Sequence, residues 1–466
     1  MIFSSYKFIF LFFPIVYLGY FLFKKTNKDE AVKLWLIAAS LYFYGNGNIK
    51  FLPILVFTAL FNFVISRGIV TSDKKPVKTV LMSLGILENL GMLFYFKYRN
   101  FFFQNINWVF GSDIAMKNII LPLGISFYTF QILSYVFDCC NGDAKKYGFT
   151  DYMLFVTFFP QLIVGPVVTH GEIIPQFKKD NLLKIDKNNI LAAIMYFSIG
   201  CAKKILLADP LIDFAAAFYG GDMEMNFITS WTAVLSYTFA YYFDFSGYID
   251  MALGLGLFFN IKLPINFNSP YKARNFADFW RRWNITISRF LNDNIFKNIF
   301  KFGDGMAKLI FATLITFIVS GIWHGAGWHY IAWGVVNGIF VSIANVMTVK
   351  RKKLPFPLAW ALTFFFSVLV RVLFDATGLF QAAAVYKTMF TFNDGILYGI
   401  RAFAAENIKV LCVIGISAFI CFFCKNTQEM LADFKPKPIH AVFCGVILAV
   451  SLFYIGSVSQ FLYFQF

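Results

Sequence analysis

The segment FIFLFFPIVYLGYFLF, residues 8–23, carries no charged side chain and is followed at once by Lys24 and Lys25. A helix that crosses the hydrocarbon core of a membrane takes about 20 mostly apolar residues. This segment is nearly that long, and comparable runs recur along the chain. Basic residues follow the run, and no small-residue cleavage site comes after it. We therefore expect a retained first span and not a cleaved signal peptide.

The composition extends this reading to the whole chain. Of the 466 residues, 59% are hydrophobic and only 14% are charged, whereas a soluble domain carries roughly 25% charged residues. We predict an all-α, polytopic membrane protein with about 11–13 transmembrane or re-entrant helices, organised as one domain over residues 1–466. The candidate spans cover residues 8–23, 31–45, 51–66, 79–96, 119–137, 152–169, 189–208, 229–259, 307–323, 329–347, 356–374, 407–424 and 439–458.

The basic residues lie mainly in short loops between the apolar runs, and the formal net charge is +16. This pattern is typical of cytoplasmic loops and of contact with anionic lipids, so membrane lipids are the expected partners and nucleic acid is not. Counting crossings between these loops places both termini outside the cytoplasm. Residues 171–308 do not fit a simple alternation, and we expect broken or re-entrant helices there.

Several kinds of site are disfavoured by the sequence. The seven cysteines are an odd number and lie mostly in or beside apolar runs, so no disulfide framework is expected. Cys421 and Cys424 form a single C-x-x-C without the second pair that a zinc site needs. His324 and His329 lack the zincin spacing. No phosphate-binding loop, dinucleotide fingerprint or nucleophile elbow is present. We expect no metal.

Polar and ionisable groups are expensive inside a membrane and need partners or a function there. The stretch YFDFSGYID, residues 242–250, places Asp244 and Asp250 in an otherwise apolar run. One interpretation is a pair of buried acids bonded to backbone or arginine. The other is that Asp244 and Tyr248 form the polar wall of a central cavity that binds substrate.

Residues 276–293, FADFWRRWNITISRFLND, alternate apolar and basic side chains at helical spacing. The pattern predicts an amphipathic helix at the membrane interface. A functional interpretation adds an anionic ligand, such as the phosphates of a carrier, bound by Arg281 or Arg282, whereas anchoring to lipid headgroups is the favoured role of Arg289. The apolar stripe consists of Phe276, Trp280, Trp283, Ile287 and Phe290.

The third polar cluster, SGIWHGAGWH at residues 320–329, interrupts two apolar runs. His324 sits at this glycine-flanked break, where small neighbours leave room for a substrate. A neutral imidazole is a natural general base near pH 7, although an intramembrane histidine can equally be a hydrogen-bonded structural residue. Arg371 and Asp375, spaced i, i+4, predict a structural ion pair.

Five blocks together resemble one family, the membrane-bound O-acyltransferases (MBOAT), in the bacterial branch of alginate and peptidoglycan O-acetyltransferases and teichoic acid D-alanyl transferases. They occur in family order, with the best-matched core at about residues 119–340. The blocks are LPLGISFY at 121–128, FPQLIVGP at 159–166, DFSGY at 244–248, FWRRW at 279–283 and WHG at 323–325.

The resemblance implies helices arranged around a central cavity and two catalytic positions. His324 falls on the essential histidine of the family, and Asn284 falls on the second position. Polysaccharide-modifying bacterial members have histidine there and many eukaryotic members have asparagine, so Asn284 departs from the branch but not from the family. We expect Asn284 to position a substrate and His324 to handle the proton. Arg281, Arg282 and Trp283 would bind substrate beside them.

Other departures concern the acceptor. The stretch FKFGDG at residues 300–305 replaces a Pro-Leu-Gly-Gly-like turn, Asn337 stands where a second histidine is common, and Phe374-Asp375-Ala376 replaces Phe-Arg-Ala. Arg371, one turn earlier, is positioned to compensate.

The resemblance implies transfer of an acyl group, with acetyl favoured, to hydroxyls of a cell-wall or exopolysaccharide outside a bacterial cytoplasmic (inner) membrane. Acetyl-CoA or an acyl carrier would be the donor, no bound cofactor is expected, and a separate SGNH-type protein outside the membrane could complete the transfer. The alternatives are a D-alanyl or lipid acyltransferase and, from another class, a transporter of acyl donor or polymer that does no chemistry.

Overall fold

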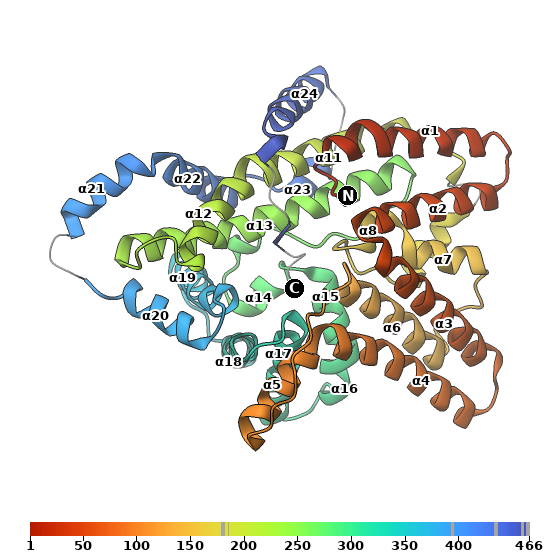
Figure 1. Ribbon diagram of the computed structural model, residues 1–466, viewed down its shortest axis with the longest axis horizontal. Coiled ribbons are helices and arrows are strands. Elements are labelled where there is room, and N and C mark those ends of the chain that lie inside the picture. The colour runs from red at the N-terminus through yellow and green to blue at the C-terminus, as the bar shows by residue number, and fades with distance from the viewer. Residues whose placement is uncertain (179–181, 185, 393–395, 433–436, 458–460, 463–466) are drawn as a thin grey trace. The chain divides into compact units, whose positions relative to one another are not determined.

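The computed structural model describes residues 1–178, 182–184, 186–392, 396–432, 437–457 and 461–462. Its regular elements are helices throughout the described residues, as Figure 1 shows. The predicted all-α, polytopic membrane architecture is therefore confirmed. The chain divides into two compact units, which are described separately below.

Seven helical stretches of the described residues are long and apolar enough to cross a membrane. An eighth results if the pair Gly399–Glu406 and Ile408–Phe423, bent by 85°, counts as one broken span. Other predicted spans correspond to shorter or more polar helices. Residues 152–169, for example, divide into α7 (Phe149–Thr157) and α8 (Phe159–Leu162). The seven stretches are Lys7–Lys24, Ile49–Thr71, Lys75–Phe110, Lys187–Gly220, Met306–His324, Trp328–Val349 and Phe356–Asp375.

Unit one comprises residues 1–200, 248–264 and 435–455. Its helices pack through aromatic side chains: the rings of Phe12 and Phe43, on η1 (Lys7–Phe12) and α2, lie 5.6 Å apart, and Phe12 also meets Phe159 at 5.6 Å. Helix α3 packs on α4, and both contact α6. The further helices are α1 (Phe13–Lys24), α2 (Asp29–Gly47), α3 (Leu52–Thr71), α4 (Lys75–Leu93), α5 (Arg99–Phe110), α6 (Ile125–Asn141), α9 (His170–Ile173), most of α11 (Lys187–Ala202) and α24 (Pro438–Phe453).

Unit two comprises residues 201–247, 265–434 and 456–466. The unit boundary falls inside α13 (Phe227–Phe258), a helix of 32 residues. The other helices of this unit are α12 (Asp209–Gly220), α14 (Phe276–Trp280), α15 (Ile285–Leu291), α16 (Lys297–Ile299), α17 (Met306–His324), α18 (Trp328–Val349), α19 (Phe356–Asp375), α20 (Leu379–Met389), α21 (Ile396–Glu406), α22 (Ile408–Phe423) and α23 (Thr427–Leu431).

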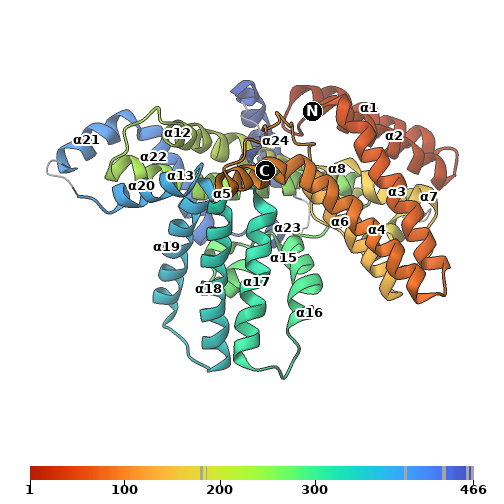
Figure 2. The same ribbon diagram turned by 60° about the horizontal axis from the view of Figure 1, so that its bottom comes forward.

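Helices α17, α18 and α19 lie side by side in unit two (Figure 2). Glycine permits the close approach of α17 and α18. A Cβ atom added at Gly334 would lie 2.4 Å from the Phe317 carbonyl oxygen, and one at Gly321 would lie 2.3 Å from that of Tyr330. Small residues at such crossings let helix backbones pack closely inside a membrane. This hairpin places the end of α17 against the start of α18.

Candidate active site

His324 is the last residue of α17 and is buried. The chain leaves the helix immediately after it, because Gly325 has extended backbone (φ −167°). The predicted break at this histidine is therefore confirmed. The imidazole lies among aromatic rings, with centroids 4.9 Å from Trp333 on α18 and 5.0 Å from Phe374 on α19. Three helices thus hold the ring in place.

Asn284 interrupts the predicted amphipathic helix. The stretch forms two short helices, α14 and α15, and Asn284 between them has left-handed backbone (φ 45°, ψ 56°). Asparagine is among the few residues that adopt this conformation readily. Asn266 stabilises the turn, because its carbonyl accepts from the Ile285 N–H at 3.0 Å and its Oδ1 accepts from the Thr286 N–H at 3.2 Å.

An extended segment runs alongside this turn. Phe267 and Trp283 form an antiparallel bridge, and the Asn268 N–H donates to the Arg282 carbonyl at 3.0 Å. These backbone bonds satisfy groups that a continuous helix would have used internally. The sequence pattern of residues 276–293 gave no sign of the break, since its cause lies in residues 266–268.

A cavity of about 530 Å³ lies between the α14–α15 region and helices α17 and α18. Asn284 and His324 both line it. Along α17 the lining runs from Thr313 through Ser320 to His324, a length of about 16 Å at 1.5 Å per residue. Val341 and Asn345 of α18 line it as well. The two residues expected to be catalytic therefore share one elongated cavity within unit two.

The carboxamide of Asn284 leaves part of its hydrogen-bonding capacity unused. Its Oδ1 is buried and accepts no hydrogen bond from any residue that the structure describes. Buried polar atoms are nearly always hydrogen-bonded, and one left without a partner costs about 1–3 kcal/mol. Asn284 lines the cavity, so its carboxamide is a candidate partner for a ligand with a hydrogen-bond donor.

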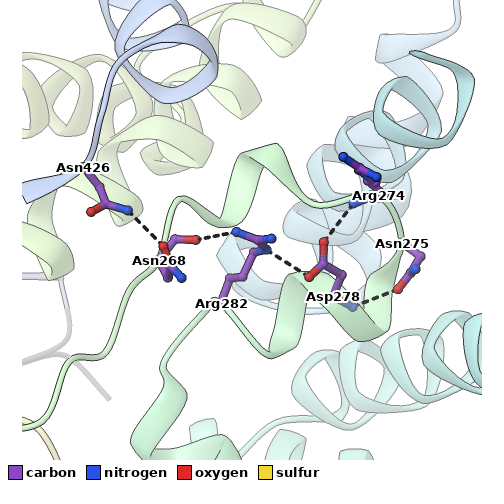
Figure 3. Close-up of polar contacts among 6 residues, drawn as sticks. All are labelled: Asn268, Arg274, Asn275, Asp278, Arg282 and Asn426. Atoms are coloured by element: carbon purple, nitrogen blue, oxygen red, sulfur yellow. Dashed lines mark hydrogen bonds and ion pairs between the residues drawn. The ribbon is translucent and has the colours of Figure 1, made fainter. Parts of the chain in front are cut away.

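The three arginines of the amphipathic stretch have different surroundings. Arg281 is exposed and lines the cavity, and Arg289 lines it too. Arg282 instead is held by protein groups, as Figure 3 shows. Its Nε donates to Asp278 Oδ1 at 2.9 Å, and a terminal nitrogen donates to the Asn268 carbonyl at 3.2 Å.

Further bonds in Figure 3 extend the Arg282 network on both sides. The Arg274 N–H donates to Asp278 Oδ2 at 3.2 Å, and Asn426 Nδ2 donates to Asn268 Oδ1 at 3.0 Å. Arg282 therefore links α14 to the extended segment and through it to the start of α23, which is a structural environment. Of the two expected phosphate-binding residues, Arg281 is the one that reaches the cavity.

Trp283 is buried beside the cavity but does not line it. Its ring stacks on Phe279 at 5.7 Å and meets Phe267 edge-on at 5.1 Å. It does line a second, smaller chamber together with His324.

Asp244 lies in a buried ion cluster away from the lining of the large cavity. Its Oδ1 lies 2.7 Å from Lys204 Nζ, which also lies 2.8 Å from Asp209. Its Oδ2 accepts from the Leu462 N–H at 2.9 Å. This supports the interpretation of Asp244 as a buried acid with protein partners, although its main partner is a lysine and not an arginine.

Lys204 was not singled out from the sequence, although a signal existed. It lies with Lys203 inside the apolar run 189–208, and a lysine there requires acidic partners. The structure places it, fully buried, in a π-helical turn (Lys203–Ala208) between α11 and α12.

Tyr248 belongs to unit one, where its ring stacks on Phe3 at 4.8 Å.

The predicted ion pair of Arg371 and Asp375 is confirmed, with two nitrogens of Arg371 at 2.6 and 3.0 Å from the carboxylate oxygens. Within the described ranges, no group of three or more His, Cys, Asp or Glu side chains could hold a metal ion.

The sequence matches the model of the membrane-bound O-acyltransferase family over residues 37–382. It is 37% identical to the "Peptidoglycan O-acetyltransferase" of Helicobacter pylori over all of this chain and 98% of that protein. It is 32% identical to a Pseudomonas putida protein described as "Probable alginate O-acetylase", over 94% of this chain and 90% of that one. A "Teichoic acid D-alanyltransferase" of Streptococcus thermophilus is 28% identical over 49% of this chain and 58% of its own length. These matches identify the chain as a multi-pass membrane O-acyltransferase that belongs to the membrane-bound O-acyltransferase family.

Proposed function

We propose that this protein transfers acetyl groups from a cytoplasmic thioester, acetyl-CoA, to hydroxyls of a polysaccharide outside the bacterial cytoplasmic membrane. The observation that carries the proposal is the single cavity lined by His324 and Asn284. The full-length similarity to a peptidoglycan O-acetyltransferase and to an alginate O-acetylase supports acetyl as the group and a cell-wall or exopolysaccharide as the acceptor.

In this mechanism His324 is the general base. Its imidazole accepts the proton of the acceptor hydroxyl as the hydroxyl oxygen attacks the thioester carbonyl carbon. The tetrahedral intermediate then collapses, the C–S bond breaks, and the proton passes to the departing thiolate, so that free CoA and an O-acetyl ester are the products. General-base catalysis of this kind contributes about 10²–10⁴-fold to the rate. The rings of Trp333 and Phe374 hold the imidazole in orientation.

Asn284 would position the donor. Its buried Oδ1 is ready to accept a hydrogen bond from an N–H of the pantetheine arm, whose two amides are the main donors along it. The left-handed turn places Asn284 at the cavity, directly before the start of α15. Arg281 and Arg289, which line the cavity, would bind the phosphates of CoA, because guanidinium groups pair with phosphate bidentately.

The elongated form of the cavity supports a donor with a long arm. The lining along α17 extends about 16 Å, which is suited to an extended pantetheine chain with its thioester at His324. A separate SGNH-type protein outside the membrane would then receive the acetyl group or act on the same polymer.

One alternative has a specific observation in its favour. The partial match to teichoic acid D-alanyltransferases supports a D-alanyl group in place of acetyl. The matches to acetyl-transferring proteins span 90% or more of both chains for the two relatives described above, so acetyl is preferred. A transporter without chemistry would not need His324.

The proposal is tested with the full-length protein reconstituted into lipid vesicles. Acetyl-CoA labelled in the acetyl group is supplied, with soluble peptidoglycan fragments or oligomannuronate as alternative acceptors. We expect release of free CoA thiol and alkali-labile label in one of the two acceptors. Uptake of intact acetyl-CoA without thiol release would instead support a transporter, and label recovered only in lipid would support a lipid acyltransferase.

A further inference from the structure

A second chamber, of about 40 Å³, lies on His324 beside the large cavity. His324 and Trp280 line both spaces. The remaining walls of the chamber include Trp283, Trp333, Phe374 and Arg371, all from unit two. The histidine thus has a large elongated space and a very small aromatic one beside the same ring.

The volume of the chamber limits its occupant. On the same measure the large cavity has about 530 Å³ and the chamber about 40 Å³, so the chamber suits only a small group of a few non-hydrogen atoms. An acetyl group consists of a methyl carbon, a carbonyl carbon and an oxygen. Propionyl adds one atom, and butyryl and D-alanyl each add two.

The polar groups around the chamber already have partners. The Asn337 amide donates to the Trp333 carbonyl at 2.8 Å, and its Oδ1 accepts from Trp280 Nε1 at 3.1 Å. The hydroxyls of Thr238 and Ser367 donate to carbonyls of their own helices at 2.7 Å. Such walls suit an apolar methyl group and offer little to a charged one.

Charge adds an argument against D-alanyl. Arg371 lines the chamber already neutralised by Asp375, and none of the lining residues is acidic. The ammonium of a D-alanyl group would therefore enter a buried space without a counterion, and burying an unpaired charge is costly.

The walls are also held firmly. The guanidinium carbon of Arg371 lies 3.3 Å from the ring centroid of Tyr241 and 4.5 Å from that of Phe374. Phe374 packs in turn on Trp333 at 5.3 Å and on His324 at 5.0 Å. Close-packed aromatic walls resist expansion to fit one more methylene.

We propose that this chamber selects the acyl group by size and charge. It accepts acetyl at His324 and excludes longer or cationic groups, and Trp333 and Phe374 are the specificity-determining residues. The inference rests on the proposed function, because it assumes a thioester donor in the large cavity. It goes further by giving the structural reason for acetyl over D-alanyl and butyryl.

The test compares acetyl-, propionyl-, butyryl- and D-alanyl-CoA in the vesicle assay, with thiol release as the readout. Each extra methylene in a tight apolar site typically changes kcat/KM by about 10–200-fold, so the wild type should prefer acetyl over butyryl by roughly two orders of magnitude or more. Phe374→Leu and, separately, Trp333→Phe should raise the butyryl-to-acetyl ratio at least about tenfold. D-alanyl-CoA should remain a poor substrate of both variants, since neither substitution supplies a counterion for its ammonium.

Phe365→Leu is the matched control, because Phe365 lies on the same helix, is partly exposed and does not line the chamber. Its acyl ratio should equal that of the wild type. Using two variants guards against one that fails to fold, and thermal stability is recorded for each. Equal use of acetyl- and butyryl-CoA by the wild type would contradict the proposal that the chamber selects the acyl group. An unchanged butyryl-to-acetyl ratio in both folded variants would contradict it too. Neither result would contradict acyl transfer itself. Absence of thiol release from every acyl-CoA by the wild type would overturn the proposed function itself.

Discussion

Unit two contains two buried polar sites that look alike in the sequence and differ in the structure. Asp244 and His324 each interrupt an apolar run. Asp244 is surrounded by groups that use its hydrogen-bonding capacity: Lys204 on one oxygen and the Leu462 amide on the other. His324 lies on a cavity that Asn284 also lines, and the Oδ1 of Asn284 accepts no hydrogen bond from the described residues. A polar residue inside a membrane thus indicates function when its surroundings leave room and unused bonding capacity for a ligand.

The largest expected effect is at the cavity. His324→Ala removes the proposed general base, so kcat for thiol release should fall by about 10²–10⁴-fold while the protein still folds and inserts. His329→Ala is the control, because His329 lies five residues on, is also buried, and lines neither space. Near-normal activity of a well-expressed His324→Ala variant would remove His324 from the mechanism.

Substitutions in the ion cluster of Lys204, Asp209 and Asp244 should lower the stability of the protein and leave catalysis unchanged. Lys204→Met leaves Asp209 and Asp244 without their shared cation, and breaking a buried pair in this way typically costs about 3–5 kcal/mol. We expect lower yield and a lower melting temperature, with the donor KM of the surviving protein unchanged. The double variant Lys204→Met/Asp244→Asn should recover part of the loss. A changed donor KM at wild-type stability would show that the Lys204 cluster takes part in donor binding.

Variants at Asn284 distinguish the contribution of its left-handed backbone from that of its side-chain hydrogen bonding. Asn284→His should be tolerated better than Asn284→Ala, since histidine carries polar nitrogens and also adopts left-handed backbone more often than most residues. Asn284→Gly relaxes the backbone but lacks the carboxamide, so it should remain impaired. The expected loss in kcat/KM for Ala and Gly corresponds to about 1–3 kcal/mol. If Gly restored full activity, only the turn would matter.

The smallest effects distinguish the neighbouring arginines. Arg281→Gln should raise the KM for acetyl-CoA severalfold, as expected when an exposed ion pair worth up to about 1 kcal/mol is lost, and leave the melting temperature unchanged. Arg282→Gln should lower the melting temperature and leave the KM for acetyl-CoA unchanged, because the bonds of Arg282 to Asp278 and Asn268 hold α14 in place. Equal changes in KM and melting temperature for the two variants would contradict a structural role for Arg282, whose bonds Figure 3 shows, and a ligand-binding role for Arg281.

Features encoded locally were predictable from the sequence. Runs of apolar residues identified the long helices, the glycines beside His324 identified the break after α17, and the i, i+4 spacing identified the Arg371–Asp375 pair. Each of these depends on neighbours within a few residues along the chain.

Features encoded by distant segments were not predictable. The turn at Asn284 depends on Asn266, and the partners of Asp244 come from the π-helical turn Lys203–Ala208 and the C-terminal residues. The small chamber requires walls from α13, α14, α17, α18 and α19 at once. No periodicity within a single segment carries that information.

The most direct test of the central claim is a structure of the full-length protein with a non-hydrolysable acetyl-CoA thioether, determined in lipid nanodiscs. We predict the acetyl group at His324, the pantetheine arm along the α17 face of the large cavity with an amide N–H bonded to Asn284 Oδ1, and the phosphates near Arg281. A donor bound elsewhere in the protein, with the His324 cavity empty, would contradict it.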